Sequence, residues 1–167
     1  YFPSSGAALT RTDLSGEALR LGRLLFSLLP EPEAGGLLAL MLLTEARRAA
    51  RTDATGEPVL LDDQDRSLWD RALIAEGESL VERSLRSRRF GPYSLQAAIA
   101  AVHAEAQRPE DTDWEQIVGL YDVLLRAAPS PVIALNRAVA VAMRDGPEAG
   151  LALIDGLLAD GGLDGYY

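Results

Sequence analysis

The sequence predicts an all-α protein of stacked antiparallel helix hairpins, and three observations support this fold class. Leu and Ala together supply 55 of the 167 residues and Val and Ile only 13, a bias that favours helix over strand. Apolar residues recur at the spacing of a helix face along most of the chain. Pro and Gly interrupt that pattern at short intervals, as they do between helices joined by tight turns.

The first two helices are predicted over residues 13–29 and 33–51, and a long loop over residues 52–64 follows them. Each helix carries one apolar face whose residues are three or four positions apart, and we expect these faces to point inward. The inward residues are Leu14, Ala18, Leu21, Leu25 and Leu28 in the first helix, and Leu37, Leu40, Met41 and Thr44 in the second.

Five further helices are predicted from their capping residues. The third covers residues 65–88 with Asp65 as its N-cap, and the fourth covers residues 93–107. The fifth, sixth and seventh extend to residues 128, 144 and 159. Their starts are the capping box from Thr112 to Glu115, the pair Ser130-Pro131, and Pro147.

The sixth helix is apolar on almost every side, so we expect other helices to cover it on several sides. Larger amphipathic helices alternate with small Ala-rich ones, which indicates a degenerate tetratricopeptide-like, right-handed α-superhelix over residues 13–167. Residues 1–12 are interpreted as a junction with upstream domains. The missing initiator Met and the unpaired seventh helix indicate a fragment of a longer protein, truncated at its C-terminus.

Composition excludes several kinds of chemistry. The chain has no Cys, no Lys and a single His, His103, which leaves no disulfide, thiolate metal site, Schiff-base Lys or His-pair metal site. Its net charge of −9 argues against direct DNA binding. The longest uncharged apolar stretch is far too short to span a membrane. We therefore expect neither an enzyme nor a metal or cofactor site.

The acidic stretch around the third helix start is one candidate partner surface, made of Asp62, Asp65, Arg66, Trp69 and Asp70. An EF-hand is excluded, because neither the Gly nor the closing Glu falls at the required position. Two interpretations stay open. The carboxylates cap the helix, Arg66 pairs with Asp70 and Trp69 anchors the loop; or the cluster offers charge and a flat apolar surface to a partner.

Polar residues within the Ala-rich helices form the other candidate surface, made of Gln96, His103, Asn136 and Arg137. A buried polar group is costly unless it is paired, so these residues either lock adjacent hairpins together or contact a partner. An alternative function is an enzyme or small-ligand-binding domain that uses His103, Asn136 and Arg137.

Three strings carry a family resemblance: residues 60–70, residues 93–104 and residues 135–141. They are similar to signature stretches of a group of extracytoplasmic-function sigma factors of the sigma-70 type. That group carries a long C-terminal extension related to tetratricopeptide repeats. The resemblance implies a cytoplasmic domain that regulates transcription initiation through protein contacts.

The partners that the resemblance implies are the upstream sigma domains and the RNA polymerase holoenzyme, with DGPF/YCII-like proteins as further candidates. A passive structural extension of the sigma factor is the remaining alternative.

Overall fold

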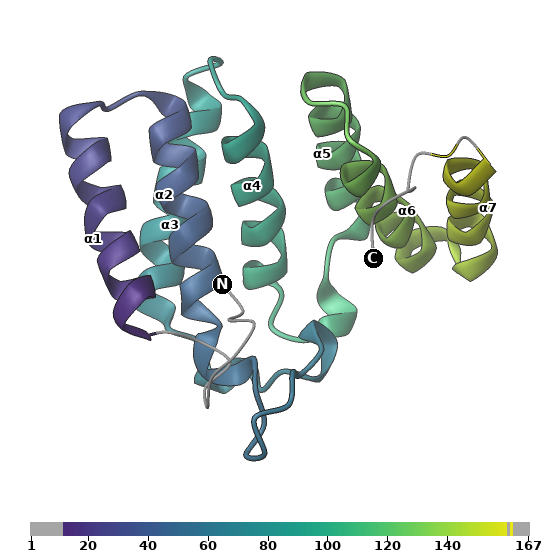
Figure 1. Cartoon of the computed structure of the whole chain (residues 1–167), viewed down its shortest axis with the longest axis horizontal. Coiled ribbons are helices and arrows are strands. Elements are labelled where there is room, and N and C mark those ends of the chain that lie inside the picture. The colour runs from purple at the N-terminus through teal and green to yellow at the C-terminus, as the bar shows by residue number, and fades with distance from the viewer. Residues whose placement is uncertain (1–11, 160, 162–167) are drawn as a thin grey trace. The chain divides into compact units, whose positions relative to one another are not determined.

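The computed structural model describes residues 12–159 and 161, and within them the chain is all-helical with no β-strand (Figure 1). This confirms the predicted fold class. The chain divides into two compact units, Tyr1–Asp111 and Thr112–Tyr167, and each is described separately. The predicted junction over residues 1–12 lies outside the described residues, apart from the backbone of Thr12, where the first helix starts.

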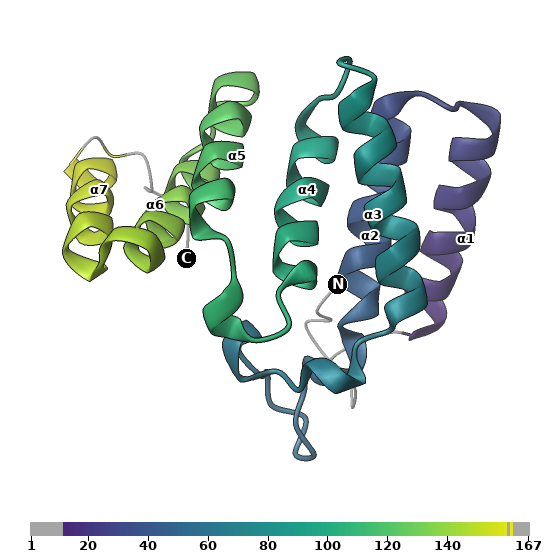
Figure 2. The same cartoon turned by 180° about the vertical axis from the view of Figure 1, so that it is seen from behind.

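The first unit contains α1 (Thr12–Leu28), α2 (Pro32–Ala46), α3 (Arg71–Arg86) and α4 (Pro92–Glu105). Helix α2 is the central element, because α1, α3 and α4 all pack against it. Figure 2 shows α3 lying across α2 on the face hidden in Figure 1. The core follows this arrangement, since the most buried leucines of the unit, Leu42 and Leu43, belong to α2.

Gly36 permits the close approach of α2 and α4. A Cβ atom at this position would lie 2.5 Å from the Ser94 hydroxyl oxygen and 2.6 Å from the Ser94 backbone nitrogen, well inside van der Waals contact. Ser94 itself is fully buried. Only a residue without a side chain therefore fits where these two helices meet.

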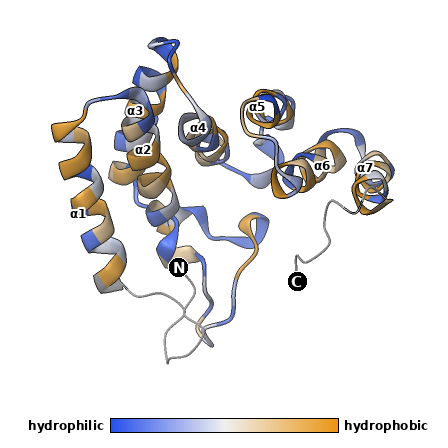
Figure 3. Cartoon of the chain, turned by 45° about the horizontal axis from the view of Figure 1, so that its top comes forward, coloured by the Kyte–Doolittle hydropathy of each residue, from blue (hydrophilic) through white to orange (hydrophobic). Residues whose placement is uncertain are grey.

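The predicted inward face of α1 is wrong. Leu14, Leu21, Leu25 and Leu28 are 42–76% exposed, whereas Leu19 and Phe26 pack into the core. The physical reason is that leucines cover a wider arc of this helix than α2 can bury. Gly22, where a Cβ would meet Leu38 at 3.3 Å, turns a different side of the helix toward α2. Figure 3 shows the apolar residues spread along α1.

The predicted inward face of α2 is correct only in part. Leu37, Leu40, Met41 and Thr44 are half-buried, and the fully buried leucines are their neighbours Leu38, Leu42 and Leu43. Three helices contact α2, so burial extends around most of it.

The second unit contains α5 (Trp114–Ala127), α6 (Pro131–Asp145) and α7 (Pro147–Ala159), with α6 packed against both others. Gly150 of α7 allows this contact, because a Cβ there would lie 2.5 Å from the Ala142 Cβ. The expectation that other helices cover α6 on several sides is correct in part: α5 and α7 both cover it, but Val139 and Met143 are each about half exposed.

Two helix starts differ from the prediction. Helix α3 begins at Arg71, and residues 66–68 form the short 3-10 helix η3 (Arg66–Leu68) instead. Helix α5 is capped by Asp113, whose carboxylate accepts the Gln116 N–H at 2.9 Å, and not by Thr112. Asp and Thr both cap helices well, but the Thr112 carbonyl already accepts the Trp114 N–H. The cap of α5 is therefore one residue later than predicted.

Helix α2 ends earlier than predicted, at Ala46, and the 3-10 helix η1 (Arg48–Ala50) follows it. Ser130 occupies the N-cap position of α6 as expected, but its side chain makes no capping hydrogen bond.

Candidate functional site

Arg66 connects the loop before α3 to the end of α4. Its side chain is 7% exposed, and its Nη1 donates to the carbonyl oxygens of His103 at 2.9 Å and Ala106 at 2.7 Å. These carbonyls belong to the last turn of α4 and the residue after it, where a helix leaves backbone acceptors unsatisfied. A guanidinium also complements the negative end of the helix dipole. Arg66 thus acts as a C-terminal cap supplied from a distant part of the chain.

Trp69 packs beneath this arginine. The Arg66 guanidinium carbon lies 4.6 Å from the centre of the indole ring, and that of Arg47 lies 5.9 Å from it. Both distances suit a cation–π interaction. Trp69 is only 3% exposed and contacts both arginines, so it anchors the loop, as one of the two interpretations expects.

Asp70 joins two helix ends. Its carboxylate accepts the N–H groups of Ala72 at 2.9 Å and Leu73 at 3.1 Å at the start of α3, and its own N–H donates to the carbonyl of Ala46, the last residue of α2. The predicted Arg66–Asp70 ion pair is therefore wrong: Asp70 caps α3 while Arg66 points to the end of α4.

Asp65 also caps a helix start, because its carboxylate accepts the Ser67 N–H at 2.9 Å at the beginning of η3. Asp62 is exposed in the 3-10 helix η2 (Leu61–Asp63). The stretch thus contains buried side chains that fasten α2, α3 and α4 together, and exposed carboxylates on the surface. We call Arg66, Trp69 and Asp70 the tether.

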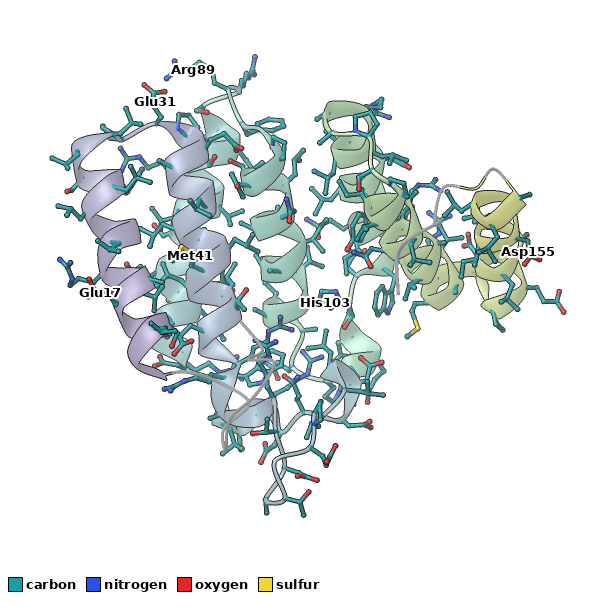
Figure 4. The ribbon with its side chains drawn as sticks, in the orientation of Figure 1. Glu17, Glu31, Met41, Arg89, His103 and Asp155 are labelled. Atoms are coloured by element: carbon teal, nitrogen blue, oxygen red, sulfur yellow. The ribbon has the colours of Figure 1, made fainter. Side chains whose placement is uncertain are left out.

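The electrostatics of the tether are dominated by cations. Burial lowers the pKa of Arg66 and of Arg47. The half-buried His103 has its pKa lowered to about 4, first by burial and then by the charges of Arg47 and Arg66. Its imidazole is consequently neutral at pH 7. Figure 4 shows His103 near the end of α4.

Sequence reasoning missed Glu33, which holds the other end of α4. Its carboxylate accepts the backbone N–H groups of Gly91, Tyr93 and Ser94 at 2.8–3.1 Å and the Ser94 hydroxyl at 2.6 Å. Burial alone would raise the pKa of Glu33, but these hydrogen bonds hold it below its usual value. No local pattern signals this role, because the partners lie 58–61 residues away.

The second predicted surface is divided between the units. Gln96 and His103 belong to the first unit, and the Gln96 amide donates to the Pro92 carbonyl one turn earlier. Asn136 and Arg137 belong to the second, where Asn136 is exposed. Arg137 Nε donates to Asp122 Oδ1 at 2.6 Å and links α6 to α5. Arg137 therefore locks one hairpin, and the structure defines no common site for the four residues.

A groove between α1 and α2, lined by described residues of the first unit, has a volume of about 540 Å³. Its walls are mainly apolar, with polar side chains where α2 ends. The lining includes Leu14, Ala18, Leu19, Leu40 and Met41, together with Glu45, Arg48 and Arg51. Arg48 Nε lies 2.9 Å from Glu45 Oε1. Sequence reasoning missed this groove, because it assigned these apolar faces to the core.

Neither a cluster of three or more metal-binding side chains nor a membrane-crossing helix occurs in the described part of the chain. The first unit thus has an apolar groove between α1 and α2 with polar side chains at one end, and a tether that fixes the ends of α2, α3 and α4.

Comparison with known proteins gives one curated relative and one family. The chain is 53% identical over 168 residues to the uncharacterized protein R00370 of Rhizobium meliloti (strain 1021), and the match covers 100% of the chain but only 39% of that protein. No solved structure matches. The model of DUF6596, a family of unknown function, matches residues 1–85. The chain therefore belongs to the DUF6596 family.

Proposed function

We propose that this chain is the regulatory, protein-interacting extension of an extracytoplasmic-function sigma factor and that it controls transcription initiation in the cytoplasm. The observation that carries the interaction role is the apolar groove of about 540 Å³ between α1 and α2, which suits a partner side chain or helix. The sigma-factor role is supported by the similarity of residues 60–70, 93–104 and 135–141 to that group. The greater length of the Rhizobium relative agrees with a larger parent protein.

Mechanistically, such a domain needs rigidity more than reactive groups. Arg66, Trp69 and Asp70 fix the ends of α2, α3 and α4, so α2, which forms one wall of the groove, is held in place. A preorganised surface loses less conformational entropy on binding. The partners in this proposal are the upstream sigma domains, the polymerase holoenzyme or DGPF/YCII-like proteins, and the domain itself performs no catalysis.

The enzymatic alternative has less support. Arg137 is engaged by Asp122, His103 has a pKa of about 4 that suits a general base poorly near neutral pH, and Asn136 is exposed in a different unit from His103. A passive structural extension is the other alternative, because Arg66, Trp69 and Asp70 all make contacts that hold helix ends of the first unit together.

Transcription in a purified system separates these possibilities. The longer parent protein is compared with a form that lacks the segment equivalent to residues 12–159, using one sigma-dependent promoter and purified polymerase. The proposal predicts a change in promoter-specific transcripts or in their response to the signal. Unchanged transcription and an unchanged response would favour the passive extension.

A further inference from the structure

Two hollows adjoin in the first unit between α1 and α3. The larger has a volume of about 300 Å³ and includes Leu38 and Ser79 in its lining, and the smaller has a volume of about 150 Å³ and includes Arg83. Phe26 of α1 and Leu80 of α3 line both. We call the space around these five residues the α1–α3 cleft. It shares no lining residue with the groove between α1 and α2.

The cleft has an apolar wall that is held in place. Phe26 and Leu80 pack against the buried Leu38 in one hydrophobic cluster. Across the larger hollow, Arg23 of α1 donates two hydrogen bonds of 2.7 and 3.0 Å to the carboxylate of Glu76 of α3. Both helices are thus joined at the cleft, which offers a ligand a preformed apolar surface.

Arg83 places a positive charge beside this surface. Its guanidinium carbon lies 5.3 Å from the centre of the Phe26 ring, and its side chain makes no hydrogen bond or ion pair with the described residues. No carboxylate lies one turn away on α3, because positions 79, 80, 86 and 87 are Ser, Leu, Arg and Ser. A guanidinium that stacks on a ring through its face keeps its N–H edge available to an anion.

The carboxylates at and beside the cleft already have partners. Three of them form ion pairs with other arginines: Glu31 with Arg89, Glu76 with Arg23, and Glu82 with Arg86. A fourth, Glu33, accepts hydrogen bonds from the start of α4. Figure 4 shows Glu31 and Arg89 next to each other. Arg83 is therefore a cation without an acidic partner in a chain whose net charge is −9.

We infer that the α1–α3 cleft binds a small carboxylic acid with an apolar body. The carboxylate pairs with the guanidinium of Arg83, and the apolar body lies against Phe26 and Leu80. A carboxylate suits the site better than a phosphate, because one unpaired guanidinium supplies the single charge and the two parallel donors that a carboxylate needs. The inference goes beyond the proposed function, since it gives the first unit a small-molecule ligand in addition to a protein partner.

The experiment uses two probes with the same apolar body, 4-phenylbutyrate and the uncharged 4-phenylbutanol. Each is titrated into the ¹⁵N-labelled 167-residue chain, and the amide chemical shifts are followed by NMR. The shifts should be largest around Ser79, Leu80 and Arg83. The carboxylate should bind at least about threefold more tightly than the alcohol at low salt, and the difference should shrink as salt screens the charges.

Two variants locate the binding. Arg83→Gln should reduce the affinity for 4-phenylbutyrate to that for the alcohol, while Arg86→Gln is the matched control, because Arg86 is an exposed arginine of the same helix that pairs with Glu82. Ser79→Phe fills the larger hollow from an exposed position and should weaken both probes at least about fivefold. Circular dichroism of the three variants establishes that the fold is retained.

Four outcomes would overturn the inference: neither probe binds, the two probes bind equally, Arg83→Gln binds like Arg86→Gln, or the shifts centre on the groove between α1 and α2. An acidic peptide that shifts the amides around Arg83 when neither probe does would also overturn it, in favour of a protein segment as the ligand. The transcription test of the proposed function is separate, because it uses neither the probes nor these substitutions.

Discussion

Arg66 is a buried cation that is held by carbonyl oxygens and an aromatic ring. Its Nη1 bonds to two carbonyls of the α4 end, while its Nε and Nη2 are buried without a hydrogen-bond partner in the described part of the chain. Such a group contributes to stability only through the acceptors that it satisfies, because its burial is itself costly.

We expect Arg66→Ala to lower the free energy of unfolding by about 3 kcal/mol, since two carbonyls lose a charged donor and Trp69 loses its stacked cation. Urea denaturation followed by circular dichroism measures this. Arg86→Ala is the control, because Arg86 is exposed and pairs only with Glu82 on the same helix; its effect should stay below about 0.5 kcal/mol. Equal effects of the two substitutions would contradict the capping role of Arg66.

His103 makes stability depend on pH in a defined window. Its folded-state pKa is about 4 against an ordinary value of 6.5, so the unfolded chain binds the proton more readily between these values. Stability should therefore be complete above pH 6.5 and decrease as pH falls toward 4, by about 3 kcal/mol in total.

This pH dependence has a direct control. His103 is the single histidine of the chain, so His103→Gln should flatten the stability curve between pH 5 and 6.5, measured by urea denaturation at each pH. A variant whose curve falls as steeply as that of the original protein would assign the effect to another group.

At the scale of the elements, helix α7 contains two glycines with opposite expected effects. A Cβ at Gly150 would clash with Ala142 and with the Ala138 carbonyl of α6, so Gly150→Ala should destabilise the protein by about 2 kcal/mol. Nothing lies within 4 Å of a Cβ at Gly156, where Ala should stabilise the helix by about 0.5–1 kcal/mol. Thermal denaturation of both variants tests the α6–α7 contact. If Gly150→Ala is as stable as the original protein, the two helices pack less closely than the structure shows.

Helices α1 and α2 differ in how much their leucines contribute to the core. Leu42 of α2 is fully buried and Leu25 of α1 is 42% exposed. We expect Leu42→Ala to cost about 3 kcal/mol and Leu25→Ala less than about 1 kcal/mol in the free energy of unfolding. If both substitutions cost the same, the exposed leucines of α1 would have to be covered within the folded chain.

The sequence predicts the helices better than their contacts. Helices α4 to α7 start and end within about two residues of the prediction, because Pro, Gly and Asp mark their ends locally. The start of α3 was missed, because Arg66 is held by carbonyls 37 and 40 positions away and Trp69 contacts Arg47, just after the end of α2.

The candidate site was harder to predict for a related reason. Periodicity identifies an apolar arc on a helix but does not say which part of a wide arc becomes buried. Leu21 and Leu25 of α1 therefore looked like core residues, and the groove beside them had no signal of its own. The role of Glu33 depends entirely on residues near position 94, which no local pattern reveals.

At the scale of the whole molecule, the net charge determines whether the chain is expected to bind DNA. With a charge of −9, the chain should not bind duplex DNA at physiological salt, because non-specific affinity comes from cations that release counterions. Fluorescence polarisation with a labelled duplex measures this directly. Sub-micromolar binding would overturn the view that the domain acts through protein contacts.

The measurement that tests the central claim most directly is promoter-specific transcription by the full-length sigma factor that we propose, with Leu21→Ser and Leu25→Ser together, compared with Leu151→Ser. The account predicts that the double variant changes transcript level or signal response at least about fivefold, while its stability and abundance match those of the control, because both carry substitutions at exposed leucines. Identical transcription by the two variants would contradict the claim that the α1–α2 hairpin is where this domain contacts its partner.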